Sequence, residues 1–368
     1  MMAEWWKIRR IAWSYWSTAF SAPVPAVRRH GLSKPASCMK NRKFLIIRFS
    51  SIGDIVLTTP LMRCLKLQLP DSEIHFVTKD KYRELVAANP YIDKIHYLTD
   101  HFGQLVRILK AEQFDVVLDL HHNFRSLLIK LAIHAPARSF QKLNMRKWIL
   151  VNLKWNLLPN EHIVDRYFRA LSGFPVFNDG KGLDFFIPEG GAYDFSALPP
   201  FFRDGYIAVI ISGTYATKQL PAEKVSGICD SIPYPVILVG GNCETPMSRE
   251  IGRRVGDHVL NLAGKTSISE SASLVREARL VLSNDTGMMH IAAAFGKKIL
   301  SFWGNTVPAF GMIPYLPGSA SEIMEVKGLK CRPCSKLGYK KCPKGHFRCM
   351  NDMDISGVVD WIKKNYDS

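Results

Sequence analysis

The sequence predicts an α/β protein with two doubly wound domains, each a sheet of parallel strands covered by helices on both faces. Short apolar runs alternate with segments of helical spacing, first from Lys43 and again from Gly205. The chain has 368 residues, 47% of them hydrophobic, which is enough to build two separate cores. Two such domains predict a central cleft between the carboxyl ends of the two sheets.

The first series of elements starts with a β-rich run over Lys43–Phe49. A tight loop and a helix over Ile55–Leu69 follow, with apolar residues at helical spacing before a Pro70-Asp71 stop. Further strands are expected at 73–77, 94–98 and 115–120, and further helices near 83–88 and at 102–112. The alternation stops between 140 and 200, which we interpret as late first-domain elements and a linker.

The second series starts at Gly205–Ile211. Its later strands are expected at 235–239, 280–283 and 298–303, and its helices after Pro221, near 249–255, at 269–277 and from Met288. We therefore place an N-terminal domain at 39–190 and a C-terminal domain at 191–368. Residues 1–38 are expected to be a disordered extension or to precede the true start of the protein.

Positive charge is concentrated at the two ends of the chain. Lys and Arg exceed Asp and Glu by 17, of which residues 1–38 contribute a net +5, and the segment 327–349 contributes eight cations without an acid. Anionic partners such as phosphates or an acidic membrane surface are therefore favoured. Nucleic acid is not expected as a partner, because proteins that follow its backbone usually spread their basic residues along one element.

No apolar run reaches the length of about 18 residues that would cross a membrane, so the protein is expected to be soluble or peripheral. The stretch from Trp5 to Trp13 mixes tryptophans with Lys and Arg, which also permits an interfacial helix at the headgroup level. A disordered extension remains the simpler interpretation of this stretch.

The loop Ser50–Asp54 joins the first strand to the first helix. Unpaired amide groups and the helix dipole favour an anion at such a position. Asp54 is either an ordinary helix cap or a catalytic carboxylate, and its spacing leaves both interpretations open.

The loop Ser283–His290 also follows a strand and opens a helix. Thr286 and Gly287 can present backbone N–H groups to a phosphate there, with no Cβ in the way at the glycine. The alternative is a capped helix in which His290 is merely buried.

Together these two loops resemble the ADP-heptose:lipopolysaccharide heptosyltransferase family of bacteria. The matching residues are Arg48 to Asp54 with Thr58-Thr59-Pro60, and Ser283 to His290 with the Ala-Ala-Ala-Phe-Gly-Lys that follows. The resemblance extends from Met39 to the C-terminus. It implies a GT-B fold of two Rossmann-like domains, in which the first holds the acceptor, the second holds the nucleotide sugar, and transfer inverts the anomeric centre without a metal.

The resemblance also implies roles for individual residues. The family's base is the Asp that ends the first loop, here Asp54, and its phosphate-binding Lys falls on Lys218. The family usually has Trp two residues after that Lys, where this chain has Leu220. The other positions implied are, for the donor, Thr214, Glu244, Asp285, Thr286, Gly287 and His290, and, for the acceptor, Ser51 and Gly53.

Asp54 and Lys218 also fit the chemistry of sugar transfer without the resemblance. An attacking hydroxyl must lose its proton as the new bond forms, and a carboxylate within reach accepts it. The leaving diphosphate gains negative charge, which a lysine and helix-terminal amides stabilise. No Asp-x-Asp metal clamp is evident beside these loops, so we expect protein cations to serve and no cofactor to be required for catalysis.

The segment His121–Ser126 follows the fourth strand at its carboxyl end, where first-domain ligands are expected. Arg125 could pair with a phosphate on an acidic acceptor. His121 and His122 could bind a metal, but no third ligand is suggested, and solvated loop histidines are the simpler interpretation.

Four cysteines, Cys331, Cys334, Cys342 and Cys349, fall within the basic segment. Four thiolates could hold a structural zinc, since the first pair has the two-residue spacing common in zinc sites. The alternatives are disulfides or reduced thiols packed beside a basic loop, and a cytosolic chain disfavours disulfides.

The leading hypothesis is an inverting heptosyltransferase that transfers heptose from ADP-heptose to a lipopolysaccharide core or lipid A-type acceptor, in the cytoplasm and peripheral at the inner face of the inner membrane. One alternative is a related GT-B glycosyltransferase that uses another nucleotide sugar. A second is a non-catalytic protein that binds an anionic glycolipid in the same cleft. Asp54 argues against the second, because a binder of anions has little use for a carboxylate facing the acceptor.

Overall fold

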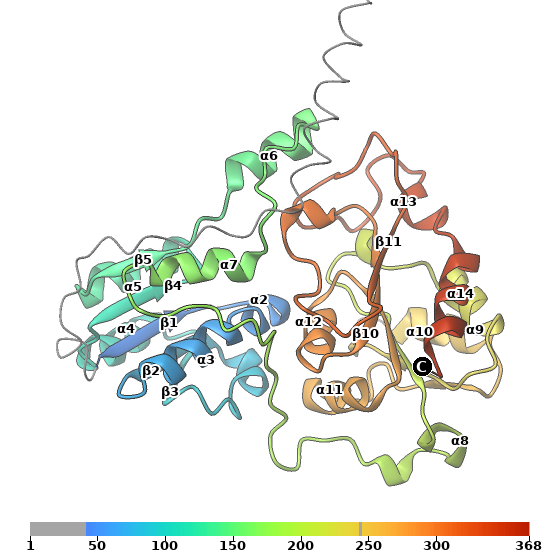
Figure 1. Ribbon diagram of the computed structural model, residues 1–368, viewed down its shortest axis with the longest axis horizontal. Coiled ribbons are helices and arrows are strands. Elements are labelled where there is room, and N and C mark those ends of the chain that lie inside the picture. The colour runs from blue at the N-terminus through green and yellow to red at the C-terminus, as the bar shows by residue number, and fades with distance from the viewer. Residues whose placement is uncertain (1–41, 243–244, 368) are drawn as a thin grey trace, which may run out of the picture. The chain divides into compact units, whose positions relative to one another are not determined.

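Two sheets of parallel strands organise the computed structural model, which describes residues 42–242 and 245–367 (Figure 1). The predicted α/β class with two doubly wound domains is therefore confirmed. The expected extension over 1–38 lies outside the described residues. Among those described, no helix has the length and apolar content needed to cross a bilayer.

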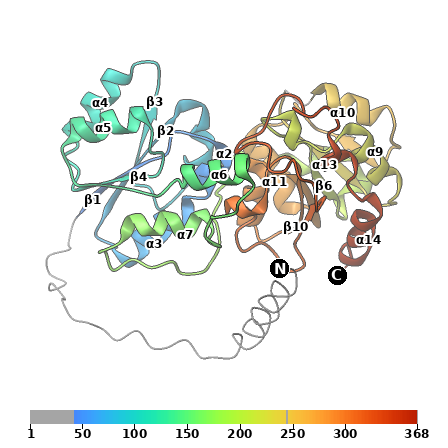
Figure 2. The same ribbon diagram turned by 90° about the horizontal axis from the view of Figure 1, so that it is seen from above.

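The first sheet has five strands in the order β3-β2-β1-β4-β5, and every neighbouring pair is parallel. The strands are β1 Lys43–Ile47, β2 Glu73–Lys79, β3 Lys94–Leu98, β4 Val116–Asp119 and β5 Ala137–Ser139. Helices α3 (Thr59–Gln68) and α7 (Ile163–Phe168) cover one face, and α4 (Phe102–Ala111) and α5 (Phe124–Ile133) cover the other (Figure 2).

Strand β1 shows why both faces are covered. Phe44 and Ile46 point into the core shared with α3 and α7, whereas Leu45 and Ile47 point into the core shared with α4 and α5. All four side chains are fully buried. A continuous apolar run is what a strand buried on both faces requires, and this is the pattern that predicted the strand.

The second sheet has six strands in the order β11-β10-β9-β6-β7-β8, again all parallel. The strands are β6 Ile207–Ile210, β7 Val236–Val239, β8 Val259–Asn261, β9 Leu280–Asn284, β10 Lys298–Trp303 and β11 Glu322–Glu325. Residues of α11 (Ile268–Glu277) and α12 (Gly287–Ala294) share a core with one face. Residues of α9 (Ala222–Asp230), α10 (Thr245–Gly252) and α14 (Ile355–Asn365) share a core with the other.

One apolar core runs from the first sheet to the second. It contains Phe44 and Ile46 together with Ala208 and Ile210, and it passes through α2 (Ile52–Val56) and α12. The two loops identified in the sequence therefore lead into helices that pack against each other. The first sheet ends at Ser139 and the second begins at Ile207, while the domain boundary at residue 190 stays a prediction.

Several elements differ from the sequence prediction. The helix expected at 55–69 is two helices, α2 and α3, and the helix expected near 83–88 is a 3-10 turn over Asp80–Leu85. The elements not foreseen are β5, β8, β11, α5, α6 (Asn144–Leu153), α7, α8 (Pro200–Arg203), α13 (Arg348–Asn351) and α14. Strands β5 and β8 have only three residues each, which is too short for an alternating pattern to stand out.

Candidate active site

The order of each sheet reverses beside one central strand, β1 in the first sheet and β6 in the second. In doubly wound sheets, ligands bind outside the carboxyl ends of the strands at this reversal. The loops that follow β1, β4, β6 and β9 all contribute to one cavity of about 570 Å³. The central cleft predicted from the two-domain pattern is therefore found where the two reversals face each other.

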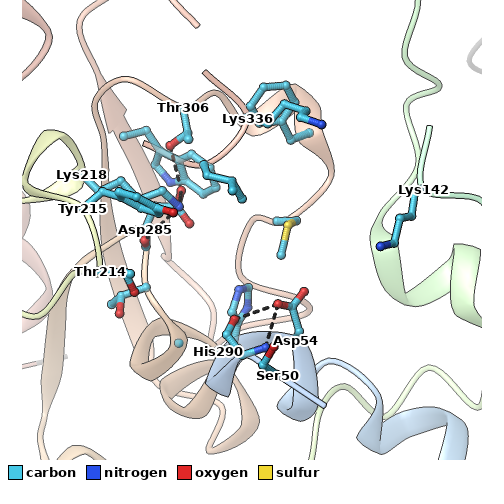
Figure 3. A pocket seen from close by; sticks show the side chains of 18 of the residues that line it. Ser50, Asp54, Lys142, Thr214, Tyr215, Lys218, Asp285, His290, Thr306 and Lys336 are labelled. Atoms are coloured by element: carbon cyan, nitrogen blue, oxygen red, sulfur yellow. Dashed lines mark hydrogen bonds and ion pairs between the residues drawn. The ribbon is translucent and has the colours of Figure 1, made fainter. Parts of the chain in front are cut away.

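Asp54 lies in the first turn of α2 and lines this cavity (Figure 3). Its Oδ2 accepts hydrogen bonds from the backbone N and the Oγ of Ser51, at 3.1 and 2.8 Å, and its Oδ1 lies 2.5 Å from Nη2 of Arg48. Burial alone would raise the pKa of this carboxyl, but the charge of Arg48 and the hydrogen bonds from Ser51 outweigh it, so the pKa of Asp54 lies below its ordinary value. The carboxylate is thus held ionised in one orientation.

Arg48 is the residue that fixes this carboxylate. Its side chain is 8% exposed, its Nε donates to the carbonyl oxygen of Ser50 at 2.8 Å, and its Nη1 donates to the carbonyl oxygen of Leu120. The guanidinium therefore bridges the loops after β1 and β4 and presents its remaining edge to Asp54. A planar group with several fixed donors can do this where a flexible lysine could not.

Lys218 ends the 3-10 turn Ala216–Lys218 after β6 and enters the cavity from the second sheet. Its Nζ lies 2.6 Å from Oδ2 of Asp285, and the hydroxyl of Thr306 donates to the same oxygen at 2.8 Å. Asp285 therefore holds the ammonium group of Lys218 in place through this ion pair. The sequence placed Lys218 and Asp285 at the same diphosphate site, and the structure brings the two side chains together.

Helix α12 begins at Gly287, with Thr286 as its N-cap, and its amino end faces the cavity. The first amides of a helix have no partner within it, so they are available to an anion. A Cβ at Gly287 would lie 2.6 Å from Cβ of Ile52 and 2.8 Å from N of Gly53. The glycine is therefore required by the close approach of α2 and α12, a constraint that the sequence analysis did not foresee.

His290 lines the cavity one turn into α12 and is 2% exposed. Burial, with a smaller contribution from the charge of His162, lowers its pKa to about 4, so the ring is neutral near pH 7. Its Nδ1 is buried and has no hydrogen-bond partner in the described part of the chain. Gly53 approaches this ring so closely that a Cβ there would lie 2.6 Å from Cδ2.

A second cavity, of about 400 Å³, adjoins the first, and Thr214 and Thr286 line both. Its apolar walls come from Ile52, Val239, Ile268 and Met288, and its polar groups include Ser212, Thr266 and Ser267. Apolar walls with a few polar groups suit a flat aromatic ring with polar edges. This cavity could not be predicted from the sequence, because its residues come from five separate segments of the chain.

Other predicted residues have different surroundings. The hydroxyl of Ser51 is used by Asp54, and Arg125 is exposed on α5 and does not belong to the lining of the cavity, so its role in acceptor binding stays a prediction. Glu244 lies outside the described residues. Asp352 and Asp354 do form an Asp-x-Asp sequence, but Asp352 pairs with Arg348 and Asp354 caps α14.

Several residues of the cavity had no role predicted from the sequence: Arg48, Lys142, Tyr215, Thr306 and Lys336. His121, interpreted from the sequence as a solvated loop histidine, is partly buried and lines the cavity. Burial and the neighbouring charge of Arg48 lower the pKa of His121 to about 4 and also lower the pKa of Lys142. The apolar run around Arg48 was a clue to a buried cation, whereas nothing in the sequence connects Lys142 or Lys336 to the site.

The four cysteines of the basic segment gather in one region without forming disulfides. Burial raises the pKa of the Cys334 thiol, and burial raises that of Cys349 to about 11; the charges of the neighbouring thiols add to both increases. Among the described residues, these thiols do not form a group of three or more ligand atoms within 4.8 Å of one another, and the structural zinc stays a prediction.

Within the described residues, a separate group that could hold a metal is His75, His96 and Glu112. It is explained without one: Nδ1 of His75 lies 3.0 Å from Nε2 of His96, and Glu112 pairs with Lys43 and Lys94.

The geometry brings a fixed carboxylate from the first sheet, and a lysine and the amino end of a helix from the second sheet, to one cavity. The family model for glycosyltransferase family 9 (heptosyltransferase) matches residues 102–341. This chain therefore belongs to glycosyltransferase family 9 and is a glycosyltransferase. The resemblance to heptosyltransferases found in the sequence is confirmed.

Relatives and solved structures agree with this family. Lipooligosaccharide heptosyltransferase 2 of Haemophilus influenzae is 26% identical over 321 residues, which cover 80% of this chain and 92% of that protein. A family 9 glycosyltransferase from Veillonella parvula matches with a TM-score of 0.72 and 19% identity over 89% of this chain and 98% of that one. The ADP-heptose lipopolysaccharide heptosyltransferase II of Escherichia coli matches with a TM-score of 0.68 and 18% identity over 88% and 98%. These two structures share the fold.

Proposed function

We propose that this protein transfers heptose from ADP-heptose to a sugar of the lipopolysaccharide core, with inversion at the anomeric carbon. The observation that carries the proposal is a fixed carboxylate, Asp54, facing the same cavity as Lys218 and the amino end of α12. A proton acceptor and an anion site in one cavity are what direct displacement of a nucleoside diphosphate by a hydroxyl requires.

Asp54 is proposed as the general base. A hydroxyl of the acceptor placed next to its carboxylate loses its proton to Asp54 as the oxygen attacks the anomeric carbon of the donor. Arg48 and Ser51 hold the carboxylate in place before the acceptor arrives, so little reorganisation is needed. Its low pKa keeps it in the ionised form that can accept a proton.

Lys218 and the amino end of α12 are proposed to bind the diphosphate. Negative charge grows on the phosphate oxygens as the bond between the heptose and the diphosphate breaks. An ammonium group and unpaired amides stabilise this charge best where water is excluded. Asp285 and Thr306 keep Lys218 at this wall. Transfer is proposed to need no divalent metal, because these groups already supply the positive charge.

The adjoining cavity of about 400 Å³ is proposed to hold the adenosine of the donor. Its apolar walls suit an adenine ring, and its hydroxyl groups suit the polar edge of the base and the ribose. Since Thr214 and Thr286 line both cavities, a nucleotide in the second would place its phosphates at α12 in the first.

The test is to incubate the purified protein with a panel of nucleotide sugars and truncated core acceptors and to identify products by mass spectrometry. We expect heptose to be added only from ADP-heptose, in the presence of EDTA as well as without it. Transfer of a different sugar would assign the site to another donor. No product with any pair, despite tight donor binding, would favour the non-catalytic binding protein.

We further propose that the enzyme acts in the cytoplasm, at the inner face of the inner membrane, because a core acceptor is carried on a lipid. The basic segment 327–349 would then lie close to anionic headgroups, which would offset its charge.

We also propose that the four cysteines of this segment hold a zinc ion as thiolates. Four thiolates and one zinc ion together carry a net negative charge, which would offset part of the positive charge of the segment. Metal analysis of the purified protein tests the zinc, and a protein with no bound zinc and four titratable thiols would exclude it.

A further inference from the structure

Helix α5 carries an apolar stripe on its outer side. Phe124, Leu127, Leu128 and Leu131 are 73%, 45%, 37% and 60% exposed. Their spacing of three, four and seven residues places them on one face of the helix. A stripe of this kind normally packs on a core, but here the residues that α5 buries are Ser126 and Ile129, on its other side.

Helix α6 and the residues after it are similarly exposed. Met145 and Trp148 are 71% and 53% exposed, and Trp155 and Leu157 just beyond the helix are 66% and 52% exposed. Of the ten residues of α6, only Leu150 is buried. Figure 1 shows this helix outside the layers of both sheets. Large apolar side chains gathered outside a core mark an interaction site.

The stretch that holds both helices has a one-sided charge. Between Asp119 and Glu161 the sequence has seven Lys and Arg residues and no Asp or Glu. Of these, Arg125 and Arg146 are exposed on the two helices, whereas Lys130 pairs with Asp119 and Lys142 lines the active-site cavity. Basic residues interleaved with Trp, Leu and Phe are typical of segments that rest on an anionic bilayer. A second copy of the same surface would bring two sets of these cations together, which disfavours self-association.

Both helices start at the rim of the active-site cavity. His121 and Lys142 line that cavity, and α5 and α6 begin three and two residues after them. A lipid surface lying against these helices would therefore hold a lipid-anchored sugar close to the cavity that contains Asp54.

We propose that α5, α6 and the segment to Leu157 form a bilayer-binding surface, which presents the lipid-anchored acceptor to the active site. This deepens the proposed function and rests on it for the identity of the acceptor. The apolar side chains enter the acyl boundary, the tryptophans sit at headgroup level, and the basic side chains contact anionic headgroups. Binding needs both parts, because charge attracts the protein and apolar burial retains it.

The test is co-sedimentation of the full chain with vesicles of phosphatidylglycerol and phosphatidylethanolamine, compared with vesicles of phosphatidylcholine alone. We expect binding to the anionic vesicles that weakens as salt rises. The double variants F124S/L131S and W148S/W155S should each lower the partition coefficient about tenfold, because each removes two exposed apolar side chains from the lipid contact. The matched control F177S/F201S removes side chains that are 71% and 53% exposed elsewhere and should bind like wild type.

Two further variants test whether other basic or tryptophan-rich segments of the chain account for the vesicle binding. Neutralising Lys340, Lys341 and Lys344 removes charge from the segment 327–349 and should reduce binding to anionic vesicles less than the α5 and α6 variants do. Replacing Trp5 and Trp6 by serine tests the first residues of the chain and should leave most of the binding. The proposal is overturned if either of these abolishes binding while the α5 and α6 variants bind normally.

Transfer activity distinguishes this inference from the proposed function. The α5 and α6 variants should transfer heptose to a soluble truncated acceptor at the wild-type rate and lose transfer to the same acceptor embedded in vesicles. Normal rates with the embedded acceptor would contradict the surface and leave the proposed function intact. Loss of vesicle binding in a protein that transfers no sugar at all would support the surface and contradict the proposed function. A change from dimer to monomer in the variants, without lipid binding by wild type, would assign the surface to self-association and overturn the proposal.

Discussion

The junctions β1–α2 and β9–α12 have the same architecture and differ in where their carboxylate lies. In each, a buried parallel strand ends, a short loop turns, and a helix begins at the wall of the cavity. The first turn of α2 contains Asp54, whereas the first turn of α12 contains no acidic residue. Both helices favour an anion at the amino end; α2 carries Asp54 within its first turn, whereas Asp285 at the second junction precedes α12 and pairs with Lys218.

In the proposed mechanism, this difference divides the chemistry between the two sheets. The carboxylate of Asp54 lies in the first turn of α2 and lines the cavity, where it is proposed to accept a proton from a hydroxyl. The carboxylate of Asp285 is held by Lys218 and Thr306, and the first amides of α12 stay available to an anion. One repeated backbone unit is thus proposed to supply the base in the first sheet and the anion site in the second.

Removing the carboxylate at the first junction should have the largest effect. Asp54→Asn keeps the shape but cannot accept a proton, so turnover should fall by about 10²-fold or more while donor affinity stays the same. Steady-state rates and calorimetry with ADP-heptose measure the two effects. Asp80→Asn, on a surface carboxylate that pairs with Arg83, is the matched control. A variant with near-normal turnover would leave Asp54 as a structural part of the helix start only.

Removing the cation at the second junction should weaken donor binding and leave acceptor binding unchanged. Lys218→Ala loses a charged contact to the diphosphate, worth about 1.5–3 kcal/mol, so donor affinity or turnover should fall by about 10- to 100-fold. Calorimetry with the donor and with a truncated acceptor separates the two. The control Lys265→Ala removes an exposed lysine outside both cavities. Unchanged donor binding together with normal rates would remove Lys218 from the site.

The packing of the two junctions against each other can be tested by a single methyl group. Gly287→Ala places a Cβ 2.6 Å from Cβ of Ile52, so one helix must shift, and we expect a loss of about 1–3 kcal/mol in the free energy of unfolding. Denaturant unfolding measures this loss. Gly103→Ala, on α4 where nothing lies within 4 Å of the added Cβ, should be neutral or slightly stabilising. Equal stability of the two variants would contradict the close approach of α2 and α12.

Changing the charge of Arg48, which lies beside Asp54, should have the smallest effect. Arg48 contributes to keeping the pKa of Asp54 below its ordinary value, so Arg48→Met should raise that pKa. Asp54 would then be protonated at a higher pH, and the acidic limb of the pH profile of kcat/KM should move upward in pH. Arg48→Lys keeps the charge and should move it less. Circular dichroism at each pH confirms that both variants are folded, and an unmoved limb would show that Arg48 does not set the ionisation of the base.

The sequence by itself determined the alternation of strands and helices, the strand–loop–helix positions of Asp54 and Gly287, and the family. These follow from local patterns: apolar runs buried on both faces, helical spacing, and residues at loop ends. The strands β5 and β8 and the division of the 55–69 helix were not predicted. Three-residue strands and a break after Leu57 depend on packing partners that lie far away in the sequence.

Only the tertiary structure decided which side chains share the cavity and what holds them. Arg48 reaches Asp54 because two loops that follow neighbouring strands in the sheet meet at its guanidinium, and Lys142 and Lys336 join the wall from segments far apart in the chain. From the sequence, the missing Cβ at Gly287 is interpreted as leaving room for a phosphate; the structure adds that α2 occupies the space a Cβ would need. Charge and close contact depend on distance in space, and local sequence patterns carry no information about distances between segments that meet only when the chain folds.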